Sequence, residues 1–153
     1  MFSLPGKAVA LFERIPGDLI AIVARIGIAT TFLRSGLLKL DGWNNGNTLA
    51  LFTDEYKLPV IPPEIAAYMA TALELSMPVL ILSGFLTRFA ALALLGMTLV
   101  IEIFVYPNAF DTHGVWAAAL LYLMKYGAGT LSLDQFIASF RGTYSTKVER
   151  GPM

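Results

Sequence analysis

The sequence contains no cysteine, a single histidine and few charged residues. Without cysteine the chain cannot form disulfides, use thiol catalysis, or offer thiolate ligands to a metal or an iron–sulfur cluster. One histidine is too few for a bis-histidine haem, so we expect no metal or haem site. Lys and Arg together number 11, as do Asp and Glu, so the formal net charge is zero. That balance leaves no electrostatic footprint for nucleic acid.

The shortage of charge is matched by a surplus of apolar residues. Charged residues make up 14% of the 153 positions and hydrophobic residues 56%, whereas roughly a quarter of a soluble domain is charged. A chain of this size must keep much of its surface in contact with solvent, and here the lipid bilayer is the solvent that suits the surface. The composition therefore predicts an integral membrane protein, with residues 1–153 forming a single transmembrane domain.

Long apolar runs predict an all-α fold, a four-helix transmembrane bundle. Each run approaches the roughly 20 residues that a helix needs to cross ~30 Å of hydrocarbon, and open strand edges are not tolerated in lipid. A longer outer loop, residues 39–62, separates the first two runs, and within it Thr48–Glu55 is expected to form a short interfacial helix capped by Asn47. The predicted spans are about 19–38, 65–86, 89–106 and 115–131.

The distribution of Lys and Arg around these runs predicts the orientation. Cytoplasmic flanks carry an excess of Lys and Arg, and both chain termini fall on the richer side, which we therefore expect to be cytoplasmic. The outer side has only Lys39 and Lys57. The richer side gathers Lys7, Arg14, Arg88, Arg141, Lys147 and Arg150.

Ionisable residues inside the runs are the first candidates for function, because each costs about 2.5 kcal/mol or more if it faces lipid at mid-depth. They are Arg25, Arg34, Glu74, Glu102 and Lys125. Two interhelical ion pairs are expected, Arg25 with Glu74 and Glu102 with Arg34. Three alternatives stay open for Arg34, which are pairing with a different neighbour, snorkelling to the outer headgroups and a contact between protomers. Lys125 is close enough to the cytoplasmic end to snorkel into the headgroups.

Helical spacing sorts these residues onto faces. Arg25 and Lys39 share a stripe of the first helix with Ala29, Phe32 and Gly36, whereas Arg34 points to the opposite side. The small residues on the stripe would let another helix approach closely. In the second run, Pro78 removes a backbone hydrogen bond to the Glu74 carbonyl. The resulting bend either aids packing or opens a cavity beside the Glu74 carboxylate.

Short segments spread over positions 18 to 135 follow one another in a recognisable order. They are Arg25–Gly27, Ser35–Lys39, Phe52–Tyr56, Leu58–Pro59, Ala72–Glu74, Pro78, Gly84–Arg88, Tyr106–Pro107, His113, Trp116, Gly127–Gly129 and Ser132–Asp134. No single segment is specific, but their order and spacing together resemble the DoxX family of small bacterial and archaeal membrane proteins. Ala128 departs from the proline more common there in the family, and Arg34 stands where many relatives have an apolar residue.

The resemblance implies a four-helix transmembrane fold and a multi-pass location in the bacterial inner membrane. The family is named for a subunit of an archaeal thiosulfate:quinone oxidoreductase, so the first hypothesis is a membrane subunit of a quinone-linked oxidoreductase. Glu74, Glu102 and His113 would then transfer protons. A quinone is the cofactor implied. Because no residue here can hold electrons, either a soluble oxidoreductase partner or a bound cofactor would have to supply them. The substrate-binding candidates are Arg25, Arg34, Lys39 and Tyr106.

Two other functions stay open at this point. Charged residues inside a bundle also line pathways for small molecules, and a binding or transport protein of only four helices would be expected to act as a homodimer. Alternatively, the chain is a structural partner of a membrane complex without turnover, and its ion pairs only fix packing. A polar cavity favours the first alternative, and a dry, fully paired interior favours the second.

Overall fold

The computed structural model describes residues 9–148 of the chain, and its side chains over residues 9–140. This part is helical with connecting turns, which confirms the all-α prediction for the described residues. Two of the helical segments, η1 and η2, are π-helical continuations of the helices before them. The elements are α2 (Gly17–Gly42), α3 (Asn47–Ala50), η1 (Leu51–Tyr56), α4 (Pro63–Ser83), α5 (Thr87–Val100), η2 (Ile101–Val105), α6 (Phe110–Tyr126) and α7 (Leu133–Val148).

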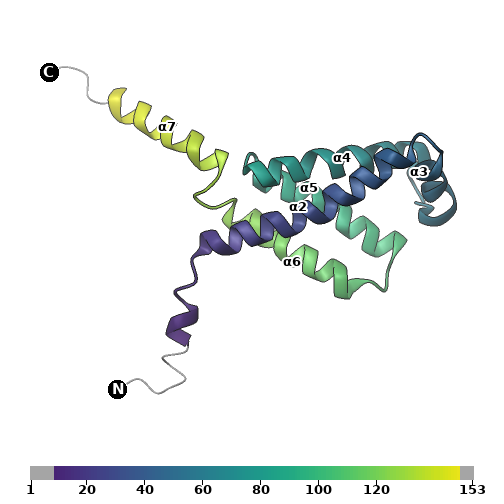
Figure 1. Ribbon diagram of the computed structural model, residues 1–153, viewed down its shortest axis with the longest axis horizontal. Coiled ribbons are helices and arrows are strands. Elements are labelled where there is room, and N and C mark those ends of the chain that lie inside the picture. Colours follow the sequence, from purple (N-terminus) through teal and green to yellow (C-terminus); the bar gives the residue numbers. More distant parts are fainter. Residues whose placement is uncertain (1–8, 149–153) are drawn as a thin grey trace.

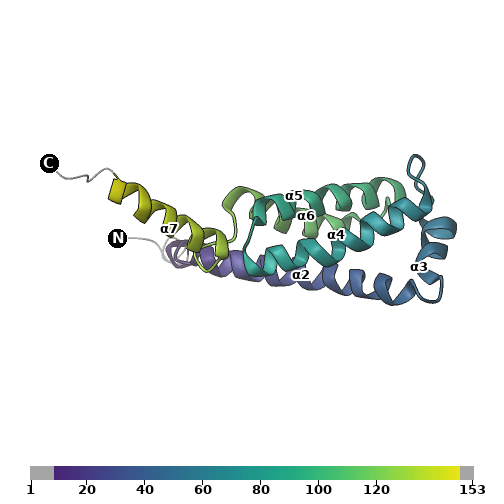
Figure 2. The same ribbon diagram turned by 90° about the horizontal axis from the view of Figure 1, so that it is seen from above.

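Four helices form a bundle in which α2 and α5 each pack against both α4 and α6 (Figures 1 and 2). The centre of the bundle is apolar, with Phe32, Ile81, Leu94 and Leu120 almost completely buried. The stripe predicted on the first helix is confirmed, because its five residues, Arg25 to Lys39, are all buried in α2.

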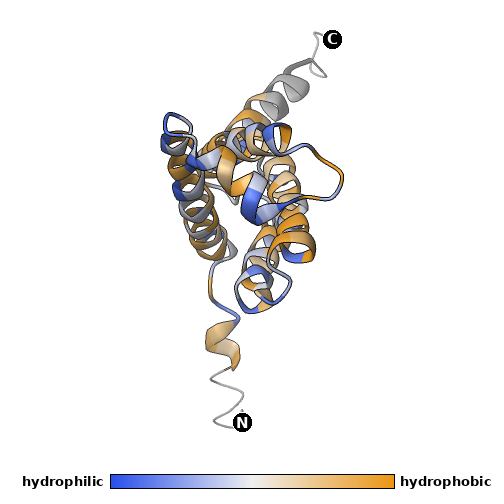
Figure 3. Cartoon of the chain, turned by 90° about the vertical axis from the view of Figure 1, so that its right-hand side faces the viewer, coloured by the Kyte–Doolittle hydropathy of each residue, from blue (hydrophilic) through white to orange (hydrophobic). Residues whose placement is uncertain are grey.

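The outer surface of the bundle is as apolar as its core. Leu38 and Phe89 are each 75% exposed, and Figure 3 colours most helical turns as hydrophobic. Within residues 9–148, three helices are long and apolar enough to cross a membrane: Gly17–Gly42, Pro63–Ser83 and Thr87–Val105. So much exposed apolar surface is stable only against lipid. The chain is therefore a multi-pass membrane protein in contact with the bilayer.

The last helix of the bundle differs from its prediction. Helix α6 has 17 residues and begins at Phe110, not near position 115, so a crossing by α6 stays a prediction. It begins early because Asp111 suits the positive end of a helix. It ends at Tyr126 because Gly127 adopts a φ of 79°, outside the helical region. Residues 127–131 are thus not helical, and α7 follows without having been predicted.

The two ends of the bundle are built differently. We call the end formed by the start of α2, the turn at residues 84–87 and residues 127–134 the terminal end. There Asp18, near the start of α2, accepts hydrogen bonds from Thr130. There Asp134 of α7 also accepts hydrogen bonds from the backbone N–H groups of Leu86 and Thr87, at the start of α5. We call the opposite end, formed by residues 43–62 and 106–110, the loop end; it carries α3 and η1 (Figure 1).

The short helix expected in the loop is present, with a different start and shape, and its place at the membrane interface stays a prediction. Helix α3 begins at Asn47 itself, after Gly46 in a left-handed conformation, and no side chain caps it. The predicted Asn47 cap is therefore wrong. The turn then widens into η1 over Leu51–Tyr56, and the prolines of the following segment lead back to α4.

Candidate functional site

The central polar feature of the bundle is an ion pair between Lys39 of α2 and Glu74 of α4. The Lys39 ammonium lies 2.8 Å and 3.0 Å from the two Glu74 carboxylate oxygens. Its third hydrogen bond goes to the Ser35 hydroxyl at 2.9 Å. The two charged side chains are only 8% and 4% exposed. All three ammonium protons are thus used, which is what a charge buried in apolar surroundings requires.

A glycine allows α2 and α4 to come this close. A Cβ added to Gly36 would lie 2.9 Å from the backbone carbonyl carbon of Glu74, closer than real side chains approach. Gly36 stands one turn before the charged end of Lys39, on the same buried stripe. The small residue therefore sets the helix separation that positions the Lys39–Glu74 pair.

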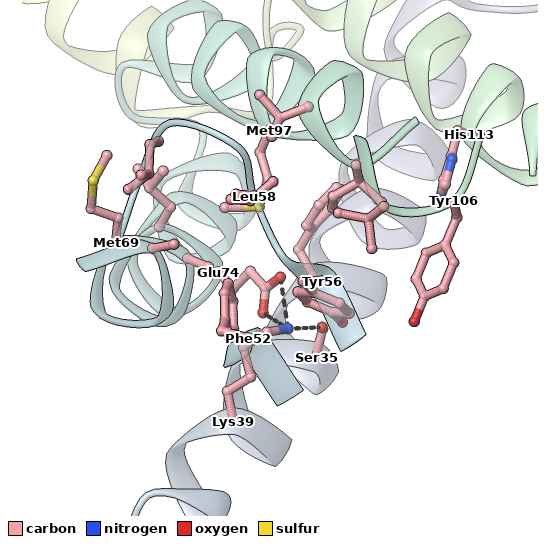
Figure 4. Close-up of a pocket in the computed structure, with 18 of the residues that line it drawn as sticks. Ser35, Lys39, Phe52, Tyr56, Leu58, Met69, Glu74, Met97, Tyr106 and His113 are labelled. Carbon is pink, nitrogen blue, oxygen red and sulfur yellow. Dashed lines mark hydrogen bonds and ion pairs between the residues drawn. The ribbon is translucent and has the colours of Figure 1, made fainter. Parts of the chain in front are cut away.

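The ion pair lies in the wall of a cavity of about 350 Å³ near the loop end. Figure 4 shows Glu74 and Lys39 meeting beside Ser35, with Tyr56 directly above. The remaining lining is mostly apolar, and includes Phe32, Phe52, Leu58, Ile61, Met69, Leu73, Met97, Val100, Ile101, Val105 and Trp116. Ligand sites commonly have this make-up, a largely apolar wall with a few placed polar groups.

A second polar pair reaches the cavity from the other side of the bundle. The His113 Nδ1 lies 2.6 Å from a carboxylate oxygen of Glu102. His113 is buried at the start of α6 and lines the cavity, whereas Glu102 stands behind it in η2. The His113 ring also lies against Trp116, with ring centroids 5.0 Å apart. The Glu102 carboxylate thus orients the His113 imidazole, which lines the cavity.

Two tyrosines close the cavity at the loop end. The Tyr106 hydroxyl donates a hydrogen bond to the Glu55 carboxylate, and the Tyr56 and Tyr106 rings meet edge to face at 5.9 Å. The bond to Glu55 raises the pKa of Tyr106 above its ordinary value. Burial raises the pKa of Tyr56 in the same direction. Both phenols are therefore neutral hydroxyl groups at ordinary pH, able to donate and accept hydrogen bonds.

Comparison with known proteins gives a consistent result. The family model for DoxX matches residues 20–107. An uncharacterized protein of Haemophilus influenzae is 34% identical over 139 residues, which cover 82% of this chain and 86% of that protein. The chain belongs to the DoxX family. No solved structure matches it significantly.

The DoxX chain brings four of the predicted site residues to one cavity: Lys39, Glu74, Tyr106 and His113. Glu102 joins them through its contact with His113. Helix α4 continues through Pro78, which is buried and does not line the cavity. The cavity lies along the part of α4 from Ala66 to Glu74, and its opening by a bend at Pro78 stays a prediction.

Arg25 is not at this cavity, and the predicted Arg25–Glu74 ion pair is wrong. Lys39 takes the place beside Glu74; it stands 14 positions further along α2, about 21 Å at 1.5 Å per residue. The Arg25 guanidinium instead donates to four backbone carbonyls at the terminal end. These belong to Ile81, Leu82, Ala128 and Leu131, at 2.5 to 3.0 Å. Arg25 thereby joins α2 to the end of α4 and to the link after α6.

The other predicted pair, Glu102 with Arg34, is also wrong. Glu102 binds His113, and Arg34 is exposed on the face of α2 opposite the buried stripe. That position follows from the helical angle that separates Arg34 from Arg25. Lys125 is exposed near the end of α6, with its ammonium over the Tyr126 ring at 5.0 Å.

Several lining residues were not predicted from the sequence. Ser35 lies four positions before Lys39 on α2, so helical spacing alone places it beside the ammonium. Tyr56 carries no such signal, because its position depends on the path of the 43–62 loop. Trp116 was not among the predicted site residues either, yet it lines the cavity and contacts His113.

Proposed function

We propose that this DoxX protein is the membrane subunit of a quinone-linked oxidoreductase and that the loop-end cavity binds the quinone headgroup. The observation that carries the proposal is the Lys39–Glu74 pair in the wall of an otherwise apolar cavity of about 350 Å³. A quinone ring is flat and apolar, with oxygens at opposite edges that need hydrogen-bond donors. The cavity offers both kinds of surface.

The chain's own side chains suit that headgroup. Phe52, Met97 and Trp116 supply apolar contact for a ring. Donors come from the Tyr56 hydroxyl and the His113 imidazole, which line the same cavity as the Lys39–Glu74 pair.

The polar groups also suit proton transfer. Reducing a quinone to a quinol takes up two electrons and two protons, and the quinone itself accepts the electrons. His113, oriented by Glu102, and Glu74, paired with Lys39, are groups that exchange protons near such a ligand. Tyr56, Tyr106 and Glu55 lead from the cavity to the exposed surface of the loop end. We assign the electrons to a soluble oxidoreductase partner, because the sequence has no cysteine.

Location and orientation belong to the same proposal. The terminal end is the richer in Lys and Arg, and we place it in the cytoplasm of a bacterium by the positive-inside rule. The cavity then opens near the outer face of the inner membrane.

A binding titration tests the proposal. The protein in lipid nanodiscs is titrated with a tail-less benzoquinone, and the intrinsic tryptophan fluorescence of Trp116 and Trp43 is followed. The double variant Lys39→Gln with Glu74→Gln removes both charges together, so that neither remains buried alone. We expect its dissociation constant to rise at least about tenfold. The matched control, Arg34→Gln, removes an exposed charge from the same helix and should bind as the wild type does.

The outcomes separate the candidate functions. Equal binding by the double variant and the wild type would remove the ion pair from the site. If the wild type binds no quinone, the proposal fails. In that case the single variant Glu74→Gln is compared with the wild type in thermal stability and in the small molecules that co-purify with it. A fall in stability alone indicates a structural role for the ion pair, and the loss of a co-purifying molecule indicates that the cavity binds another ligand.

A further inference from the structure

We infer that the ligand of the loop-end cavity carries a long hydrocarbon or isoprenoid chain and enters sideways from the bilayer, between α4 and α5. This rests on the proposed function and deepens it, because it fixes the class of ligand as lipid-soluble. The alternative is a water-soluble ligand that enters only past Tyr106 at the loop end.

The first argument is that the cavity wall is continuous with the lipid-facing surface. Met69 and Leu73 of α4 line the cavity on one side, and Met97 and Val100 of α5 line it on the other. Met69 is also 51% exposed and Val100 38% exposed on the outside of the bundle. Both belong to helices apolar enough to span a membrane. The same side chains thus face the cavity and the lipid.

The second argument concerns the side chains at this opening. The four residues that flank it are uncharged and apolar, so a hydrocarbon chain passing between them would leave no polar group without a partner. Two of them are methionines, whose unbranched side chains adapt to different neighbours. Figure 4 shows Met69 and Met97 at the cavity.

The third argument is the position of the polar groups. Lys39, Glu74 and His113 lie inside the cavity, and the exposed polar residues Glu55 and Tyr106 lie at the loop end. A ligand with a polar head and an apolar tail matches this arrangement if the head points inward and the tail leaves between α4 and α5. A wholly polar ligand would leave the apolar wall between the helices unused.

Bulky substitutions at the opening test the inference. Met69→Trp and Val100→Trp narrow it from opposite walls, and the matched controls are Val79→Trp and Leu99→Trp, which change exposed positions of the same helices that do not line the cavity. Each protein in nanodiscs is titrated with a tail-less benzoquinone and with the same quinone bearing a long isoprenoid chain. We expect the two opening variants to weaken binding of the tailed quinone at least about tenfold. The ratio of the tailed to the tail-less dissociation constant should rise by a similar factor in the opening variants, and both affinities of the controls should stay within about twofold of the wild type.

Retained tailed-quinone binding in both opening variants would overturn the inference while leaving the proposed function intact. Equal loss in the opening and control variants would overturn it too, because the effect would not belong to the opening. If the wild type binds neither quinone, the proposed function and the inference both fail. Tail-less binding also reports folding, and the two opposite walls provide independent variants should one of them misfold.

Discussion

At the scale of single residues, the site depends on which basic residue of α2, Arg25 or Lys39, lies level with Glu74 along the bundle axis. Arg25 and Lys39 share one buried stripe of α2, and both were candidates from the sequence. Their outcomes differ because the stripe runs the length of the helix: Arg25 meets the carbonyls at the terminal end, and Lys39 meets Glu74. Helical periodicity predicted the face correctly but not the partner, which depends on how far α2 and α4 are displaced along each other.

The close approach of α2 and α4 yields a prediction at Gly36. Gly36→Ala adds a methyl group where the nearest atom of Glu74 would be 2.9 Å away, so the two helices must separate. We expect a loss of about 1–3 kcal/mol in the free energy of unfolding, the usual cost of overpacking. Quinone affinity should fall as well, because the Lys39–Glu74 pair is displaced.

Gly27→Ala is the matched control, since a Cβ there meets nothing within 4 Å on the same helix. Thermal unfolding in detergent, compared between the two variants, measures the difference. Equal stabilities would show that Gly36 does not set the helix separation.

At the scale of elements, apolar length predicted the helices well and their ends less well. Residues 19–38 fall within α2 and all four runs contain a helix, because a segment in lipid must satisfy its backbone internally. The ends of α6 depend on Asp111 and Gly127, whose roles are local. Helix α7 was not predicted, because it is not an apolar run. Residues 101–105 were predicted as helix, but the sequence pattern did not indicate the π-helical form of η2.

Helix α7 contributes a cap that can be tested. Asp134 accepts hydrogen bonds from the N–H groups of Leu86 and Thr87, at 2.9 Å and 3.2 Å, and so satisfies donors that the first turn of α5 leaves free. Asp134→Ala should cost about 0.5–2 kcal/mol of unfolding free energy. Hydrogen exchange should speed up at the start of α5.

Asp41→Ala provides the comparison, because it removes an exposed aspartate near the end of α2. Its exchange pattern at α5 should match that of the wild type. If Asp134→Ala leaves exchange and stability unchanged, the contact between α7 and the start of α5 does not persist in the membrane.

At the scale of the whole molecule, composition alone indicated the bilayer, and the exposed apolar surface agrees. What composition could not predict is the asymmetry of the two ends. The 43–62 loop supplies Tyr56, Leu58 and Ile61 to the cavity, so the loop end holds the candidate site. At the terminal end, the hydrogen bonds of Arg25, Asp18 and Asp134 connect the helices to the segments between them. Loop paths lack the periodicity that identifies helices, which is why these contributions were not predicted.

The orientation follows as a prediction for the whole chain. Because the sequence has no cysteine, one introduced cysteine reports the side on which it lies. Asn45→Cys at the loop end should react with a membrane-impermeant maleimide added to intact cells after the outer membrane is made permeable. Phe85→Cys at the terminal end should react only after the inner membrane is opened. The reverse pattern would invert the topology and place the cavity near the cytoplasm.

The most direct test of the central claim is photoaffinity labelling with a quinone that carries a photoreactive group on its ring. The account predicts that, in the protein embedded in lipid, the label attaches to residues of the loop-end cavity, such as Tyr56, Met97 and Trp116, and that excess unlabelled quinone abolishes the attachment. Labelling that is confined to the outer lipid-facing surface, or that unlabelled quinone does not reduce, would contradict it.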